Sequence, residues 1–106
     1  MTAGGPQLER GHTRIANELL EQLAKHLTIS GCQMGVMLMV IRFSYGYGRK
    51  HADFTLAELG RLLGMDRSNT RRAVMALQGK NMLAVTPRHG HKRQRFQIRK
   101  DWRRWV

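Results

Sequence analysis

The sequence predicts a mainly α, α+β domain: a winged helix-turn-helix of three to four helices with a C-terminal β-hairpin as the wing. Two short helical patterns separated by a glycine turn lie between residues 55 and 79, and a hairpin pattern follows them directly. The formal net charge of +12 fits a nucleic-acid partner. The 106 residues leave room for one such domain, expected over residues 12–101 between a flexible arm (1–11) and a basic-aromatic tail (102–106).

The charge comes from 19 Lys and Arg against 7 Asp and Glu, an excess most simply explained by a polyanion. The basic residues do not follow one amphipathic helix, which argues against a membrane partner. Cys32 is the only cysteine, so an intramolecular disulfide and a thiolate metal cluster are excluded. The longest apolar run, residues 36–41, is too short to cross a bilayer, and we therefore expect a cytoplasmic protein.

Two helices are expected ahead of the helix-turn-helix. Thr13 is a plausible N-cap for the first, which runs to about His26 with an apolar stripe of Ile15, Leu19, Leu20, Leu23 and Leu27. Ser30 and Gln33 match a capping box that opens the second helix, which runs to about Tyr45. This helix is apolar on nearly all sides, which is typical of a central core helix or of one that also makes a dimer contact.

The helix-turn-helix pattern begins with a second capping box, Thr55 and Glu58. Gly64 supplies the turn and Asp66 is the N-cap of the next helix, the recognition helix. The spacing of one set of residues on that helix predicts its inward face: Thr70, Ala73, Val74 and Leu77.

The outward side chains at the start of this helix are the predicted DNA contacts: Arg67, Ser68, Asn69, Arg71 and Arg72. Arginine can bind guanine O6 and N7, asparagine can pair with adenine, and serine can bind a base or a phosphate. A merely solvated helix face is the alternative. The absence of acids on this face after Asp66 favours DNA contact.

The wing is predicted from residues 82–86 as one strand and 94–99 as the next, with Phe96 and Ile98 on the buried side. Its connecting turn is rich in cations, and the end of the second helix carries two more. Contacts to the DNA backbone or minor groove are expected from Arg49, Lys50, Arg88, His89, His91, Lys92, Arg93 and Arg95. Arg49 and Lys50 equally suit the helix C-terminus they follow.

Neither a metal nor another cofactor is expected, since His89 and His91 have no carboxylate or cysteine nearby in the sequence. The acids are scattered and no glycine-rich phosphate loop follows a strand, so no enzyme is expected either. In the tail, Trp102 and Trp105 alternate with arginines. This pattern fits stacking on single-stranded bases, but packing of one Trp against the domain is the favoured interpretation.

Three segments resemble the N-terminal domain of the lambdoid phage replication protein O family: TRIANELLE at 13–21, SYGYGRK at 44–50, and residues 55–77. The likeness runs over about residues 11–85, with His12 and Asp66 departing from the family pattern. It implies a winged helix that binds repeats of double-stranded DNA in a phage replication origin, commonly as a homodimer, in the nucleoid of a bacterial host cell. The helix starting at Arg67 would recognise the origin.

In that family a separate C-terminal region recruits the replicative helicase or its loader. That region is absent here, so such a partner is expected only through a segment outside this chain. Two other functions stay open from the residues alone. One is a winged-helix transcription regulator, and the other is a protein-interaction module whose basic face binds an acidic partner.

Overall fold

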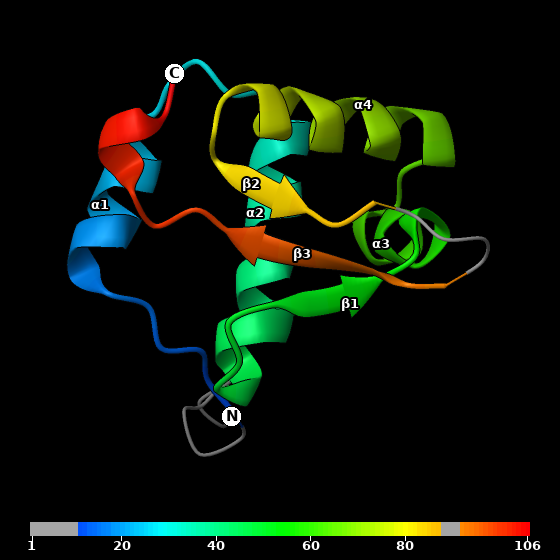
Figure 1. Cartoon of the computed structure of the whole chain (residues 1–106), viewed down its shortest axis with the longest axis horizontal. Coiled ribbons are helices and arrows are strands. Elements are labelled where there is room, and N and C mark those ends of the chain that lie inside the picture. Colours follow the sequence, from blue (N-terminus) through cyan, green and yellow to red (C-terminus); the bar gives the residue numbers. More distant parts are fainter. Residues whose placement is uncertain (1–10, 88–91) are drawn as a thin grey trace, which may run out of the picture.

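The computed structural model describes residues 11–87 and 92–106. These residues form four helices, α1 (Asn17–Lys25), α2 (Gly31–Ser44), α3 (Leu56–Leu63) and α4 (Arg67–Gly79), and three strands, β1 (Ala52–Phe54), β2 (Leu83–Val85) and β3 (Gln94–Ile98). Two 3-10 turns follow α2 and β3, at Tyr45–Tyr47 and Trp102–Arg104. The predicted mainly α, α+β winged helix is confirmed, with α1 added in front of it (Figure 1).

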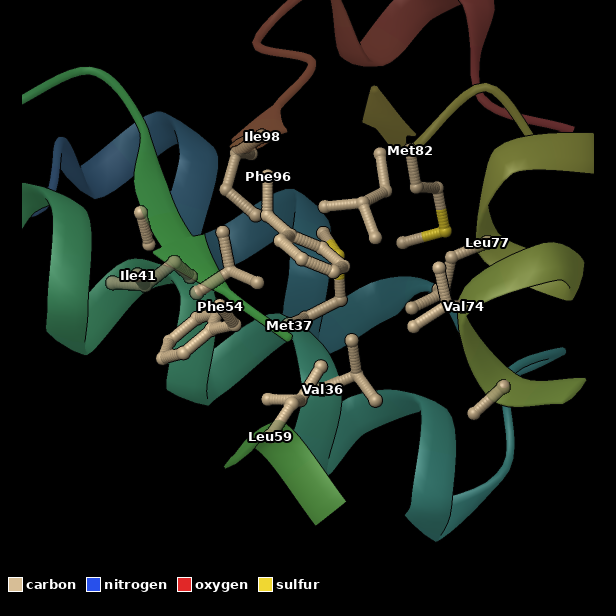
Figure 2. Close-up of a cluster of buried hydrophobic side chains, with 14 of the residues drawn as sticks. Val36, Met37, Ile41, Phe54, Leu59, Val74, Leu77, Met82, Phe96 and Ile98 are labelled. Atoms are coloured by element: carbon tan, nitrogen blue, oxygen red, sulfur yellow. The ribbon is translucent and has the colours of Figure 1, made fainter. Parts of the chain in front are cut away.

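Helix α2 is the centre of the core, as its all-round apolar pattern predicted. The capping box is present: the Ser30 hydroxyl accepts from the Gln33 N–H and the Gln33 side chain accepts from the Ser30 N–H, each at 3.2 Å. Val36, Met37 and Ile41 on α2 are buried against side chains from α3, α4 and the sheet (Figure 2). The helix therefore holds the sheet and the helix-turn-helix in one body.

The sheet has three antiparallel strands in the order β1-β3-β2. The predicted hairpin, β2 with β3, is present, and its pairing extends by one bond at each end, from the Thr86 N–H and the Arg99 N–H. The third strand was not predicted: β1 pairs with β3, with Ala52 opposite Phe96. Three residues are too few to show a strand period, so the sequence did not predict this partner.

Helix α1 begins later than predicted. It starts at Asn17 behind Ala16, and no side chain caps it, so Thr13 is not its N-cap. Thr13 instead lies against the 3-10 turn, where a Cβ added to Gly46 would be 3.0 Å from its hydroxyl oxygen. At the other end the helix stops at Lys25, so the apolar period does not reach Leu27, which is 87% exposed.

The C-terminal tail packs on the domain beside α1 (Figure 1). The Trp105 indole lies against the core and donates to the Arg99 carbonyl at 2.9 Å. The Trp102 indole donates to Glu18 Oε1 at 2.7 Å, and the Val106 N–H donates to the Lys80 carbonyl at 2.9 Å. The predicted packing of one tail Trp against the domain is thus confirmed for Trp105.

Candidate nucleic-acid interface

The helix-turn-helix is built from local hydrogen bonds that the sequence predicted. The Thr55 hydroxyl accepts from the Glu58 N–H at 3.0 Å, and Glu58 Oε1 accepts from the Thr55 N–H at 2.9 Å. Gly64 ends α3 with a φ of +67°, which favours glycine. Asp66 then caps α4, since its Oδ1 accepts from the Asn69 N–H at 2.7 Å.

A close approach fixes the position of α4 against α3. A Cβ added at the buried Gly60 would lie 2.8 Å from the Met65 carbonyl oxygen and 2.9 Å from the Thr70 hydroxyl oxygen. The Thr70 hydroxyl donates to the Asp66 carbonyl at 2.8 Å, so it is satisfied in the core. Gly60 was not among the residues predicted from the sequence, although a glycine inside a helical pattern is the signal for such an approach.

The predicted inward face of α4 is confirmed, since Thr70, Ala73, Val74 and Leu77 are all buried. The five outward side chains selected from the sequence are all exposed: Arg67, Ser68, Asn69, Arg71 and Arg72. None of these three arginines forms an ion pair with a carboxylate in the described part of the chain. The start of α4 therefore presents guanidinium groups that are available to an anion.

Asn69 differs from its neighbours on this face. Its side-chain Nδ2 donates to Asp66 Oδ2 at 3.2 Å, in addition to the backbone bond that caps the helix. An adenine contact would have to share this amide with the carboxylate or exchange one partner for the other. The arginines of the face need no such exchange.

A groove joins α4 to the wing. It has a volume of about 580 Å³, and Arg67, Ser68 and Arg71 of α4 line it together with Leu56 and Gln94. A second groove continues it along α4 and β2 as far as Pro87. The recognition helix and the base of the wing thus form one surface. Gln94, whose side chain donates to the Thr86 carbonyl at 2.8 Å, was not selected from the sequence.

The wing is tied to α3 by an ion pair. Arg93 Nε donates to Glu58 Oε1 at 2.8 Å, and Arg93 Nη2 donates to Glu58 Oε2 at 2.6 Å. The two bonds make a bidentate ion pair. The Arg93 hydrogen bonds, followed by the Thr55 N–H, lower the pKa of Glu58 to about 2. Glu58 therefore caps α3 and anchors the wing with the same carboxylate.

The other predicted backbone contacts are placed differently. Lys92 is exposed, and Arg95 Nε lies 4.0 Å from Asp53 Oδ1. Arg49 pairs with Asp53 at 3.2 Å, and with Lys50 it lines a separate groove beside Trp102. That groove lies by the α2–β1 connection, whereas α4 begins at the other end of the long axis (Figure 1). Three further predicted contacts lie outside the described residues: Arg88, His89 and His91.

A family model described as bacteriophage replication protein O matches residues 6–105. The chain belongs to this family. Membership implies a role in phage DNA replication, and the match extends the resemblance seen from the sequence through the wing and into the tail. No curated protein and no solved structure matches the chain significantly.

Two further findings concern the part of this family member that the structure describes. No helix there is long and apolar enough to cross a membrane. Within residues 11–87 and 92–106, no group of three or more His, Cys, Asp or Glu side chains is arranged to hold a metal ion.

Proposed function

We propose that this protein binds a specific sequence of double-stranded DNA in a phage replication origin, with the start of α4 in the major groove. The observation that carries the proposal is the exposed face of α4, whose arginines have no carboxylate partner in the described chain. Recognition helices insert their N-terminal residues first, which is where these side chains stand. Membership of the replication protein O family supports the origin as the target.

The residues of α4 divide by position. Arg67 and Arg71 are one helical turn apart and line the groove toward the wing, so they are the proposed readers of guanine. Ser68 and Arg72 are the neighbouring pair, proposed for base or phosphate contact. Asn69 is proposed as a weaker contributor, because one donor of its amide is already bonded to Asp66.

The wing supplies phosphate contacts in this proposal. Lys92 and Arg95 are exposed, and Arg88, His89 and His91 of the wing turn are proposed for the same role. Arg93 instead holds the wing against α3 through Glu58. Binding as a homodimer is part of the proposal, since an origin with repeated sites would give each copy its own site.

Selection from random duplexes, followed by location of the recovered motif in phage genomes, tests this function. We expect one motif, repeated within a replication origin; promoter sites would instead favour the transcription regulator. Affinity for the motif should fall by at least about a hundredfold between 50 and 200 mM salt, because about four phosphate contacts release counterions. An affinity that barely changes would favour the protein-interaction module and contradict DNA binding.

The Arg71→Ala variant separates recognition from charge. We expect it to lower affinity for the selected motif more than affinity for unrelated duplex, because a guanine contact discriminates and a phosphate contact does not. The Arg72→Ala variant removes the same charge from the same helix and is the matched comparison. An equal loss on all sequences for both variants would remove Arg71 as a reader.

A further inference from the structure

A second basic groove lies away from α4. The residues just before α1, the α2–β1 connection and the C-terminal 3-10 turn line it, and its volume is about 840 Å³. Five cations from these three segments border it: Arg14, Arg49, Lys50, Lys100 and Arg103. Because they come from distant parts of the chain, the sequence did not bring them together.

The positive charge of this groove is largely uncompensated. Glu18 is the only acid among its lining residues, and its Oε1 accepts from the Trp102 indole at 2.7 Å. Arg49 is paired with Asp53, which lies outside the groove. The other four cations form no ion pair with a carboxylate in the described residues. The groove therefore attracts anions.

Two aromatic side chains stand among these cations. The Arg103 guanidinium lies 4.6 Å from the centre of the Trp102 ring, and the Lys100 ammonium lies 5.2 Å from that of Tyr45. The bond from Trp102 to Glu18 fixes the indole on α1. The Arg103 guanidinium lies over one face of the indole, so an unpaired base would stack on the opposite face or take the place of Arg103, while its phosphates meet the positive charge.

The shape of the groove points to a single strand. Its volume is in the range of small-ligand sites, so it accommodates a few unpaired nucleotides rather than the width of a duplex. An acidic peptide would satisfy the charge but offers no planar groups for Trp102. We propose that this groove binds single-stranded nucleic acid, at a site separate from the duplex surface of α4 and independent of it.

The first test measures binding of an oligothymidylate of about twelve residues, a length typical of single-strand sites, by fluorescence anisotropy. The Arg14→Ala/Lys100→Ala variant should bind it about tenfold more weakly. Its slope of log affinity against log salt should fall by about 1.4, because each lost phosphate contact removes about 0.7. Affinity for the selected duplex should change by less than about twofold, since these side chains lie away from α4.

The matched control is Lys25→Ala/Arg104→Ala, which removes the same charge from exposed positions outside both grooves. It should leave oligothymidylate binding within about twofold of the unsubstituted protein, because it removes no groove contact. If the control weakens binding as much as the groove variant, general charge is responsible and the proposal is wrong. Unchanged binding by the groove variant contradicts the proposal equally.

The second test uses Trp102 as the reporter. In Trp105→Phe the only remaining indole is Trp102, and its fluorescence should be quenched by the oligothymidylate if a base stacks on it. Polyglutamate at the same charge concentration should not displace the oligonucleotide. Absence of quenching contradicts stacking, and displacement by polyglutamate would identify an acidic protein segment as the occupant. Should Trp105→Phe not fold, Trp102→Ala, expected to weaken binding at least about fivefold, decides the same point.

Discussion

The arginines of α4 and those around the sheet differ in what stands beside them. Arg67, Arg71 and Arg72 have no carboxylate partner in the described chain, whereas Arg93 makes a bidentate pair with Glu58 and Arg49 pairs with Asp53. A guanidinium that is already paired has fewer free donors for a phosphate, and its charge is partly compensated. The first group is therefore suited to a ligand and the second to holding the fold.

Few acids are needed to organise this domain of charge +12. Asp53 lies within 4.0 Å of Arg95 and 3.2 Å of Arg49, so one carboxylate on β1 serves both neighbours. Glu58 similarly joins α3 to the wing. These acids lie on the sheet and on α3. The exposed face of α4 carries no acidic side chain after its N-cap, Asp66. The arginines on the surface that we propose for DNA are thus left uncompensated.

The largest effect is expected when the α4 arginines that have no carboxylate partner are removed. The Arg67→Ala/Arg71→Ala variant should lose at least about 2 kcal/mol, or about thirtyfold, in affinity for the selected duplex, since each guanine contact contributes about 1–3 kcal/mol. Anisotropy titration measures this, with Lys25→Ala/Arg104→Ala as the charge-matched control. Equal losses in both variants would show that net charge, and not the position of the arginines on α4, sets the affinity.

The next largest effect is expected at Gly60, where α3 and α4 approach each other closely. Gly60→Ala should lower the free energy of unfolding by about 1–3 kcal/mol, because its Cβ meets the Met65 carbonyl and the Thr70 hydroxyl below 3.0 Å. Urea unfolding measures the change. Gly79→Ala is the control: a Cβ there meets nothing within 4 Å, so the variant should be neutral or up to about 1 kcal/mol more stable. A neutral Gly60→Ala would remove the close approach as a constraint.

A smaller effect is expected at the cap of α4. Asp66→Asn keeps a good N-cap, removes a negative charge next to the proposed phosphates and prevents the bond to Asn69 Nδ2. Duplex affinity should rise by about twofold to fivefold, as a charge at a helix terminus contributes about 0.3–1 kcal/mol. Asp101→Asn makes the same charge change at the tail and should have no such effect. The same rise in both would assign it to net charge alone.

The smallest effect is expected at the wing anchor. Glu58→Gln keeps the capping box but loses the pair with Arg93, so the melting temperature should fall slightly near neutral pH. The pKa of Glu58 is depressed from 4.5 to about 2, so the pair stabilises the protein fully above pH 4.5 and fades toward pH 2. The difference in melting temperature between Glu58→Gln and the unsubstituted protein should therefore be constant down to about pH 5 and vanish in acid. Glu21→Gln is the control, and a difference that grows in acid would contradict the assignment.

The sequence was sufficient for most local interactions, although the N-cap predicted at Thr13 does not form. Both capping boxes, the turn at Gly64 and the cap at Asp66 join residues within one helical turn, and all are present. The pairing of β1, the Glu58–Arg93 ion pair and the groove beside Trp102 join segments that lie far apart in the sequence. Composition counts cations, but only the fold shows which of them face a carboxylate.

The most direct test of the central claim is methylation interference on the selected duplex. Dimethyl sulfate modifies guanine N7 in the major groove and adenine N3 in the minor groove. The account predicts that guanine N7 methylation blocks binding within the motif and that Arg67→Ala/Arg71→Ala loses this sensitivity. Interference confined to adenine N3, or guanine interference that persists unchanged in the variant, would contradict insertion of α4 into the major groove.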